Sequence, residues 1–107
     1  MMEDGNIGFA VYSKGVEPGT LDARWTYENC WAGPGLATGG PEQGFAGDYH
    51  IRYYLDSGEF SDEYDLRIER TGDLYELQWL TGNEVSAIGV GMEVDGRLAV
   101  GWRRVSD

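Results

Sequence analysis

The chain of 107 residues has few of the side chains on which disulfides, metal sites and covalent chemistry depend. It has one cysteine, Cys30, which excludes an intrachain disulfide and makes a cysteine-based zinc site implausible. It also has one histidine, His50, so a metal site built from several histidines of one chain is excluded. We therefore predict no metal, no cofactor and no catalytic residue, and expect Cys30 to be inert because it has neither a histidine nor a second cysteine nearby.

Basic residues are scarce as well. One lysine and seven arginines stand against 19 carboxylates, which leaves a net charge of −11. Nucleic-acid binding draws its affinity from basic side chains that neutralise phosphates, so DNA and RNA are excluded as partners. The same charge disfavours binding to anionic membrane surfaces.

Long apolar runs are also missing, because the longest apolar stretches are only a few residues and too short to cross a bilayer. The N-terminal Met-Met-Glu-Asp-Gly is acidic and lacks the basic and apolar regions of a signal peptide. We therefore expect a soluble protein located in the cytoplasm. The length predicts a single domain over residues 1–107.

What the chain does have is short stretches in which apolar and polar residues alternate, separated by glycines. Alternation with period two is typical of half-buried β-strands, and no segment keeps apolar residues at helical spacing. A further, weaker strand is expected over residues 35–39. The predicted inward-facing residues are Ile7, Phe9 and Val11; Leu21, Ala23, Trp25 and Tyr27; Tyr49, Ile51, Tyr53 and Leu55; Tyr64, Leu66 and Ile68; Tyr75, Leu77 and Trp79; Ile88, Val90 and Met92; and Leu98, Val100 and Trp102.

Hairpin turns are predicted at Thr71-Gly72, Gly82-Asn83 and Asp95-Gly96. At the last of these, a two-residue loop would pair Met92 with Ala99. A three-residue loop over residues 94–96 would instead pair Met92 with Leu98, which aligns every large apolar side chain on one face. We expect the three-residue loop, which also places Glu93 opposite Arg97 as a favourable cross-strand pair.

A faint internal repeat divides the chain into two similar halves of four strands, at about 5–55 and 62–104. Residues 21–25 precede Gly33-Pro34-Gly35 much as residues 75–79 precede Gly89-Val90-Gly91. Eight antiparallel strands with one apolar face each require either closure or a second sheet. Closure removes the sheet edges, so we predict an all-β, eight-stranded antiparallel up-and-down barrel, with a β-sandwich as the alternative.

The strand number and the placement of the aromatic residues resemble the calycin group of small barrels, which includes lipocalins, avidins and fatty-acid-binding proteins. The alternation of glycine and tryptophan is also similar to that of small bacterial β-barrel proteins. The calycin resemblance implies a barrel that holds a small molecule. No binding residue is carried over, because Gly19 lies too far from Trp25 to match the Gly-x-Trp of lipocalins.

The predicted inward face is rich in aromatic residues with polar tips. These side chains are candidates for lining a pocket that holds a small apolar or aromatic ligand. The alternative is a barrel filled by its own side chains. The candidate ligand-binding residues are Trp25, Tyr27, Tyr49, Tyr53, Tyr64, Tyr75, Trp79 and Trp102.

The predicted register also places small residues together on the outer face. Gly89, Gly91, Ala99 and Gly101 would form a smooth stripe that lets another backbone approach closely. We expect a second copy of the chain there, in a homodimer, with the chain's own N-terminal segment or barrel curvature as alternatives.

Two charged features are interpreted as surface. His50 is expected to lie opposite Glu69 as a solvent-exposed pair. The acidic stretch 56–63 does not have the spacing of a calcium loop and is interpreted as a solvated hairpin connection.

Three functions are compatible with these features. The first is a non-enzymatic module that binds a small, partly apolar molecule. The second is a protein-interaction or regulatory module that acts through its outer face. The third is a cofactor-free lyase or isomerase, which would be favoured by an arginine or a glutamate inside the barrel.

Overall fold

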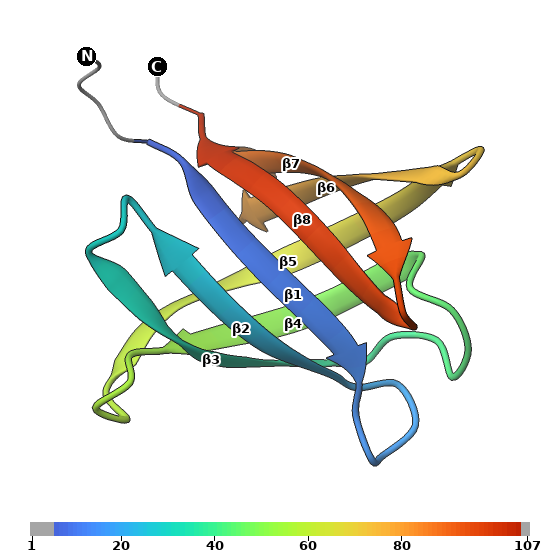
Figure 1. Cartoon of the computed structure of the whole chain (residues 1–107), viewed down its shortest axis with the longest axis horizontal. Helices are drawn as coiled ribbons and strands as arrows, with labels where there is room; N and C mark the ends of the chain where they lie inside the picture. Colours follow the sequence, from blue (N-terminus) through green and yellow to red (C-terminus); the bar gives the residue numbers. More distant parts are fainter. Residues whose placement is uncertain (1–5, 106–107) are drawn as a thin grey trace.

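The computed structural model describes residues 6–105, which form eight strands and no helix (Figure 1). Residues 1–5, which include the acidic N-terminus and the start of the first predicted half, lie outside the described residues. The strands are β1 (Gly8–Lys14), β2 (Leu21–Tyr27), β3 (Trp31–Thr38), β4 (Gly47–Tyr54), β5 (Phe60–Thr71), β6 (Leu74–Thr81), β7 (Glu84–Val94) and β8 (Arg97–Arg104).

Each strand pairs antiparallel with the next along the chain, and β1 pairs with β8 to close the sheet. The prediction of an eight-stranded antiparallel up-and-down barrel is therefore confirmed, and the β-sandwich alternative is wrong. Closure pairs the edges of a sheet and lets every strand turn its apolar face inward. The described part of the chain contains no helix long and apolar enough to cross a membrane.

The interior follows the predicted alternation on β2, β4, β5, β6 and β8. Leu21, Ile51, Leu66, Leu77 and Val100 are buried in the core that these strands share. Their polar neighbours in sequence point outward, as a half-buried strand requires.

The predicted faces of β1 and β7 are wrong. On β1 the inward residues are Gly8, Ala10 and Tyr12, whereas Phe9, expected inside, is 48% exposed. On β7 the inward set is Ala87, Gly89 and Gly91, and the residues expected inside, Ile88, Val90 and Met92, face outward.

The physical reason for both inversions is the size of the aromatic rings inside the barrel. A Cβ added at Gly8 would lie 2.1 Å from Cε2 of Trp102, and one at Gly89 would lie 3.1 Å from the ring of Trp79. Because the rings fill the space in front of these strands, the strands present their smallest residues to the interior. The larger apolar residues of β1 and β7 are left on the outside.

The predicted register between β7 and β8 is also wrong. Met92 pairs with Ala99, which is the register of the two-residue turn. Asp95 and Gly96 both have positive φ, 53° and 79°, as a type I′ turn requires, and this turn matches the natural twist of the strands. Glu93 accordingly pairs with Leu98 rather than with Arg97.

The corrected register separates the four residues of the expected glycine stripe. Gly89 and Gly91 face the interior, while Ala99 and Gly101 face outward. A continuous stripe of small residues on the outer face therefore does not exist. The dimer interface that was predicted from this stripe loses its original basis.

Candidate functional site

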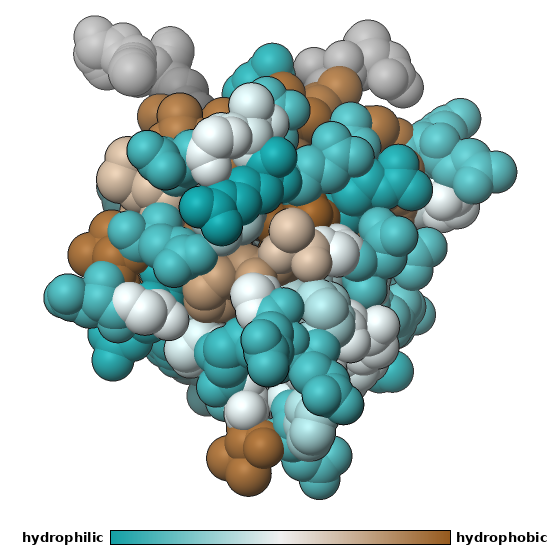
Figure 2. All heavy atoms as spheres, turned by 90° about the vertical axis from the view of Figure 1, so that its right-hand side faces the viewer, coloured by the Kyte–Doolittle hydropathy of each residue, from teal (hydrophilic) through white to brown (hydrophobic). Residues whose placement is uncertain are grey.

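The two ends of the barrel are built differently. At the end where β3 leads into β4, the connection 39–46 folds inward and buries Phe45, which is 4% exposed. The Phe45 ring meets Tyr75 edge to face at 6.3 Å, and its carbonyl accepts a hydrogen bond from the Tyr49 hydroxyl at 3.0 Å. Figure 2 looks onto the side that carries the β5–β6 and β7–β8 turns, and hydrophilic residues cover most of that side. This end of the barrel is closed.

The opposite end carries the β2–β3 and β4–β5 turns, at the left of Figure 1. Its interior is open to solvent. It contains a cavity of about 380 Å³. The residues that line it are Trp25, Tyr27, Trp31, Tyr53, Leu55, Phe60, Ser61, Asp62, Tyr64, Trp79, Ala87, Trp102 and Arg104. Trp31 and Phe60, at its mouth, are 52% and 50% exposed.

Of the eight candidate ligand residues, the structure brings six together around this cavity: Trp25, Tyr27, Tyr53, Tyr64, Trp79 and Trp102. The other two, Tyr49 and Tyr75, pack at the closed end against Phe45. Alternation along a strand shows which residues point inward, but not at which end of the barrel they lie. A ligand-binding role for the six residues remains a prediction.

The floor of the cavity is a hydrogen-bonded cluster centred on the Tyr53 hydroxyl. This hydroxyl accepts a hydrogen bond from Trp79 Nε1 at 2.7 Å and shares another with the Tyr12 hydroxyl, also at 2.7 Å. Burial raises the pKa of both Tyr12 and Tyr53 well above the ordinary value for tyrosine. The floor therefore stays uncharged at neutral pH, and its polar groups are already paired.

The walls are aromatic rings in mutual contact. Tyr27 and Trp102 stack with their centroids 4.9 Å apart and their planes 14° apart, and Trp79 lies 6.0 Å from Trp102. Trp25 meets Tyr53 edge to face at 5.9 Å. The Trp25 Nε1 donates to the carbonyls of Pro34 and Tyr54 across β3 and β4, so this indole is held against the wall. Rings packed in this way present flat apolar surfaces to the cavity.

Two charged residues of the mouth were missed by the sequence analysis. Arg104 pairs with Ala87 and Asp62 pairs with Tyr53, and both partners face inward. The signal was available, because Asp62 precedes the inward Tyr64 by two residues and Arg104 follows the inward Trp102 by two. The predicted alternation ends at the last apolar residue of each strand, whereas the inward face continues to the rim, where charged side chains reach water.

Both charges are close enough to the Tyr64 hydroxyl to affect its ionisation. Burial and the Asp62 carboxylate raise the pKa of Tyr64, and the Arg104 guanidinium acts in the opposite direction. Tyr64 is therefore a neutral phenol at physiological pH and is able to donate a hydrogen bond. An arginine or a glutamate inside the barrel was expected to favour a lyase or isomerase; Arg104 lies at the rim of the cavity and is exposed.

Three aromatic residues of the site were missed for different reasons. Tyr12 was missed because the face of β1 was inverted. Trp31 and Phe60 are the first residues of β3 and β5, directly after turns. At Trp31 no strand was predicted, because the strand there was expected to begin only at residue 35. At Phe60 a solvated loop was predicted.

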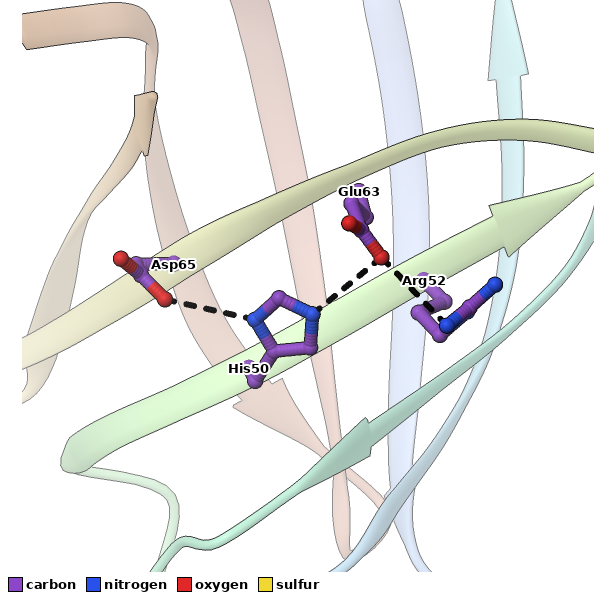
Figure 3. Close-up of polar contacts among 4 residues, drawn as sticks. All are labelled: His50, Arg52, Glu63 and Asp65. Carbon is purple, nitrogen blue, oxygen red and sulfur yellow. Dashed lines mark hydrogen bonds and ion pairs between the residues drawn. The ribbon is translucent and has the colours of Figure 1, made fainter. Parts of the chain in front are cut away.

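The outer wall carries a charged cluster on β4 and β5 (Figure 3). His50 lies opposite Asp65, not Glu69 as expected, and its ring nitrogens are 3.3 Å from Asp65 and 3.4 Å from Glu63. Glu69 pairs instead with Glu76 on β6. The error came from the expected acidic loop over 56–63, which is shorter than predicted because β5 begins at Phe60.

This cluster is solvated rather than built as a site. The His50 side chain is 48% exposed, and exposed ion pairs contribute little to stability. A more open depression of about 390 Å³ beside it is lined by exposed polar residues together with Tyr49, Leu66 and Leu80. Among residues 6–105 no three His, Cys, Asp or Glu side chains are arranged to hold a metal ion. Cys30 is exposed in the turn between β2 and β3.

Fold and site together define a small, closed, eight-stranded β-barrel that is filled at one end and has an aromatic cavity at the other. No family model, curated protein or solved structure matches this chain.

Proposed function

We propose that this protein is a non-enzymatic binding module that holds a small, flat and largely apolar molecule in the cavity at the open end of its barrel, in the manner of lipocalin-like barrels. One observation carries the proposal: a cavity of about 380 Å³, open at one end, has walls made mainly of aromatic rings. Ligand pockets for small molecules typically occupy roughly 300–1,000 Å³ and combine apolar walls with a few polar groups.

The arrangement of the walls also supports a ligand rather than a second layer of core. At the closed end the chain supplies its own filling side chain, Phe45. At the open end the mouth residues Trp31 and Phe60 leave about half of their surface exposed. Exposing large rings around a cavity is unfavourable in water, and a flat apolar ligand would remove that surface from solvent.

A panel of small aromatic compounds tests this proposal through quenching of tryptophan fluorescence and a rise in melting temperature, because a ligand selective for the folded state stabilises it. Ala87 lines the cavity, so Ala87→Met should fill it and weaken binding about tenfold or more. Thr38→Met places the same side chain on the exposed outside of β3 and serves as the matched control.

A panel in which no compound shifts the melting temperature of the wild-type protein would exclude the binding function. Equal losses of affinity in the two variants would mean that binding occurs elsewhere. Chemical analysis of the bound compounds after incubation also tests the lyase or isomerase alternative, which requires conversion of the compound.

A second candidate function is self-association through the outer face of β1, β7 and β8. This face carries an apolar strip, which we define as Phe9, Val11, Ile88, Val90, Met92, Val94, Ala99 and Gly101. Gly101 pairs with Phe9 on one side and Val90 on the other, so the strip is continuous across the three strands. Val90 is 67% exposed and Met92 is 52% exposed.

The charge distribution favours a second copy as the occupant of this strip. Two chains with a net charge of −11 repel each other wherever their carboxylates meet. The strip contains no aspartate or glutamate, so contact here brings two copies together without opposing carboxylates. Two of the four originally predicted interface residues, Ala99 and Gly101, belong to it.

Gly101→Lys tests self-association, since a Cβ at Gly101 meets nothing within 4 Å and the lysine would enter the contact without disturbing the core. We expect the wild-type protein to sediment as a dimer and this variant as a monomer. Thr38→Lys, on the exposed surface of β3, is the control and should remain dimeric. A wild-type protein that sediments as a monomer at high concentration excludes this function.

A further inference from the structure

Arg104 is the only cationic residue among those that line the cavity. It is the last residue of β8, and its register with Ala87 places it on the inward face at the rim, where it lines the cavity and is still exposed to solvent. Lys14, the only lysine of the chain, lies at the other end, where its Nζ donates to the carbonyls of Pro41 and Gly44. A positive charge is therefore placed at the mouth of the aromatic cavity in an otherwise acidic protein.

The position of Arg104 is fixed by its surroundings. Asn6 accepts a hydrogen bond from the Arg104 backbone N–H at 2.8 Å and donates one to its carbonyl at 3.2 Å. The same Asn6 side-chain oxygen accepts a hydrogen bond from the Tyr27 hydroxyl at 2.9 Å. The Arg104 guanidinium lies 5.3 Å above the Tyr27 ring, which is a cation–π geometry. A guanidinium held in this way loses less freedom when a ligand binds to it.

Among residues 6–105, the Arg104 guanidinium differs from three other arginines in having no carboxylate partner. Arg24, Arg52 and Arg67, on the outer wall, each form an ion pair with a carboxylate. Within residues 6–105, no carboxylate lies at ion-pair distance from Arg104. Arginine binds carboxylates through two parallel hydrogen bonds, and such charge-assisted bonds are stronger than neutral ones.

We infer that the cavity takes a flat aromatic molecule that carries a carboxylate, and that the Arg104 guanidinium binds this carboxylate at the mouth while the ring lies against the stacked Tyr27 and Trp102. The inference rests on the proposed binding function and specifies the chemical class of its ligand. The neutral Tyr64 hydroxyl, next to Arg104, is placed to donate a further hydrogen bond. The Asp62 carboxylate opposes the ligand's charge, so it reduces affinity.

A matched pair of compounds, 2-naphthoate and 2-naphthol, tests this inference by calorimetric titration, because both have the same ring system and only the first is an anion at neutral pH. Arg104→Gln should weaken 2-naphthoate binding roughly 10- to 100-fold and change 2-naphthol binding little. Arg103→Gln, which removes the same charge from the outward face of β8, is the control and should leave both affinities unchanged.

A second variant guards against a loss of affinity that comes from misfolding. Asp62→Asn removes the opposing charge and should strengthen 2-naphthoate binding by about 3- to 10-fold, a gain that disruption of the structure does not produce. Equal binding of 2-naphthoate to the wild type and to Arg104→Gln overturns the anion site. Retained 2-naphthol binding in that case leaves the proposed binding function intact, whereas failure of the whole aromatic panel rejects both.

Discussion

The two ends of this barrel use the same kinds of side chain for different purposes. At the closed end, Tyr49 and Tyr75 pack around Phe45, and Lys14 holds the connection 39–46 in place through two carbonyls. At the open end, tyrosines and tryptophans surround a cavity of about 380 Å³. The difference lies in the connections, because the β2–β3 turn spans only residues 28–30 and is too short to fold a ring into the barrel.

This comparison shows that aromatic content alone does not distinguish a filled barrel from a pocket. One end of the interior is filled by the chain's own side chains, and the other end contains a cavity. The long connection 39–46 folds back and fills its end of the barrel with Phe45. A tight turn adds no side chain to the interior, so the rings beneath it stay accessible to solvent. The following variants test this division, in order of decreasing effect.

Trp79→Ala should have the largest effect, because Trp79 is 3% exposed and its indole N–H is bonded to Tyr53 at the cavity floor. We expect a loss of about 3–5 kcal/mol in the free energy of unfolding, out of the roughly 5–15 kcal/mol typical of a domain. Urea denaturation measures this loss. A stability equal to that of the wild type would mean that Trp79 does not pack in the core beneath the cavity.

Phe45→Ala removes the side chain that fills the closed end, so this end should also contain a cavity. We expect the substitution to lower the free energy of unfolding by about 3 kcal/mol, the low end for a buried phenylalanine, because a connection is able to relax. Phe60→Ala, at the open mouth, is the matched control and should cost less than about 1 kcal/mol because Phe60 is half exposed. Similar losses in the two variants, measured by denaturation, would contradict the distinction between a closed and an open end.

Gly89→Ala and Gly101→Ala test which small residues face the rings of the open end. A Cβ at Gly89 would lie 2.8 Å from the Gly101 carbonyl oxygen, so this substitution should cost about 1–3 kcal/mol. At Gly101 the space is open, and alanine should change the stability by no more than about 0.5 kcal/mol. Similar, small effects of the two substitutions on thermal stability would instead favour the three-residue register, in which both glycines face outward.

The smallest effect is expected from the tyrosine ionisations at high pH. Burial raises the pKa of Tyr49 to about 12, above the value of 10.0 expected in the unfolded chain. The unfolded state therefore releases its proton first, and the stabilisation present below pH 10 is lost as the pH rises toward 12. Melting temperatures across this range should fall less steeply in Tyr49→Phe. Identical slopes in the two proteins would show that Tyr49 ionises freely in the folded state.

Much of the fold follows from patterns that are local in sequence. Alternation over Tyr75, Leu77 and Trp79, and the turn residues at Gly82-Asn83, depend on strand geometry and on allowed backbone angles. Such features are the same in any β-protein, so they were predicted correctly. The up-and-down barrel follows from them, since strands joined by tight turns pair in order and closure removes the edges.

The candidate site was predicted in part. Six aromatic residues of the cavity were identified because large rings at inward positions stand out in a sequence. Asp62 and Arg104 were missed because their inward position depends on where the barrel ends, and a charged residue at an inward position is tolerated only at the rim. The position of the rim is a property of the closed sheet, not of any one strand.

Local sequence accounts for the strands, for the positions of most turns and for the aromatic interior, because each of these depends on neighbouring residues. The tertiary structure alone decided which faces of β1 and β7 point inward and which end of the barrel stays open. In those two strands the larger apolar residues lie outside, because rings from distant strands already fill the space in front of Gly8 and Gly89. That competition for volume is between residues far apart in the chain, and it appears only when the barrel closes.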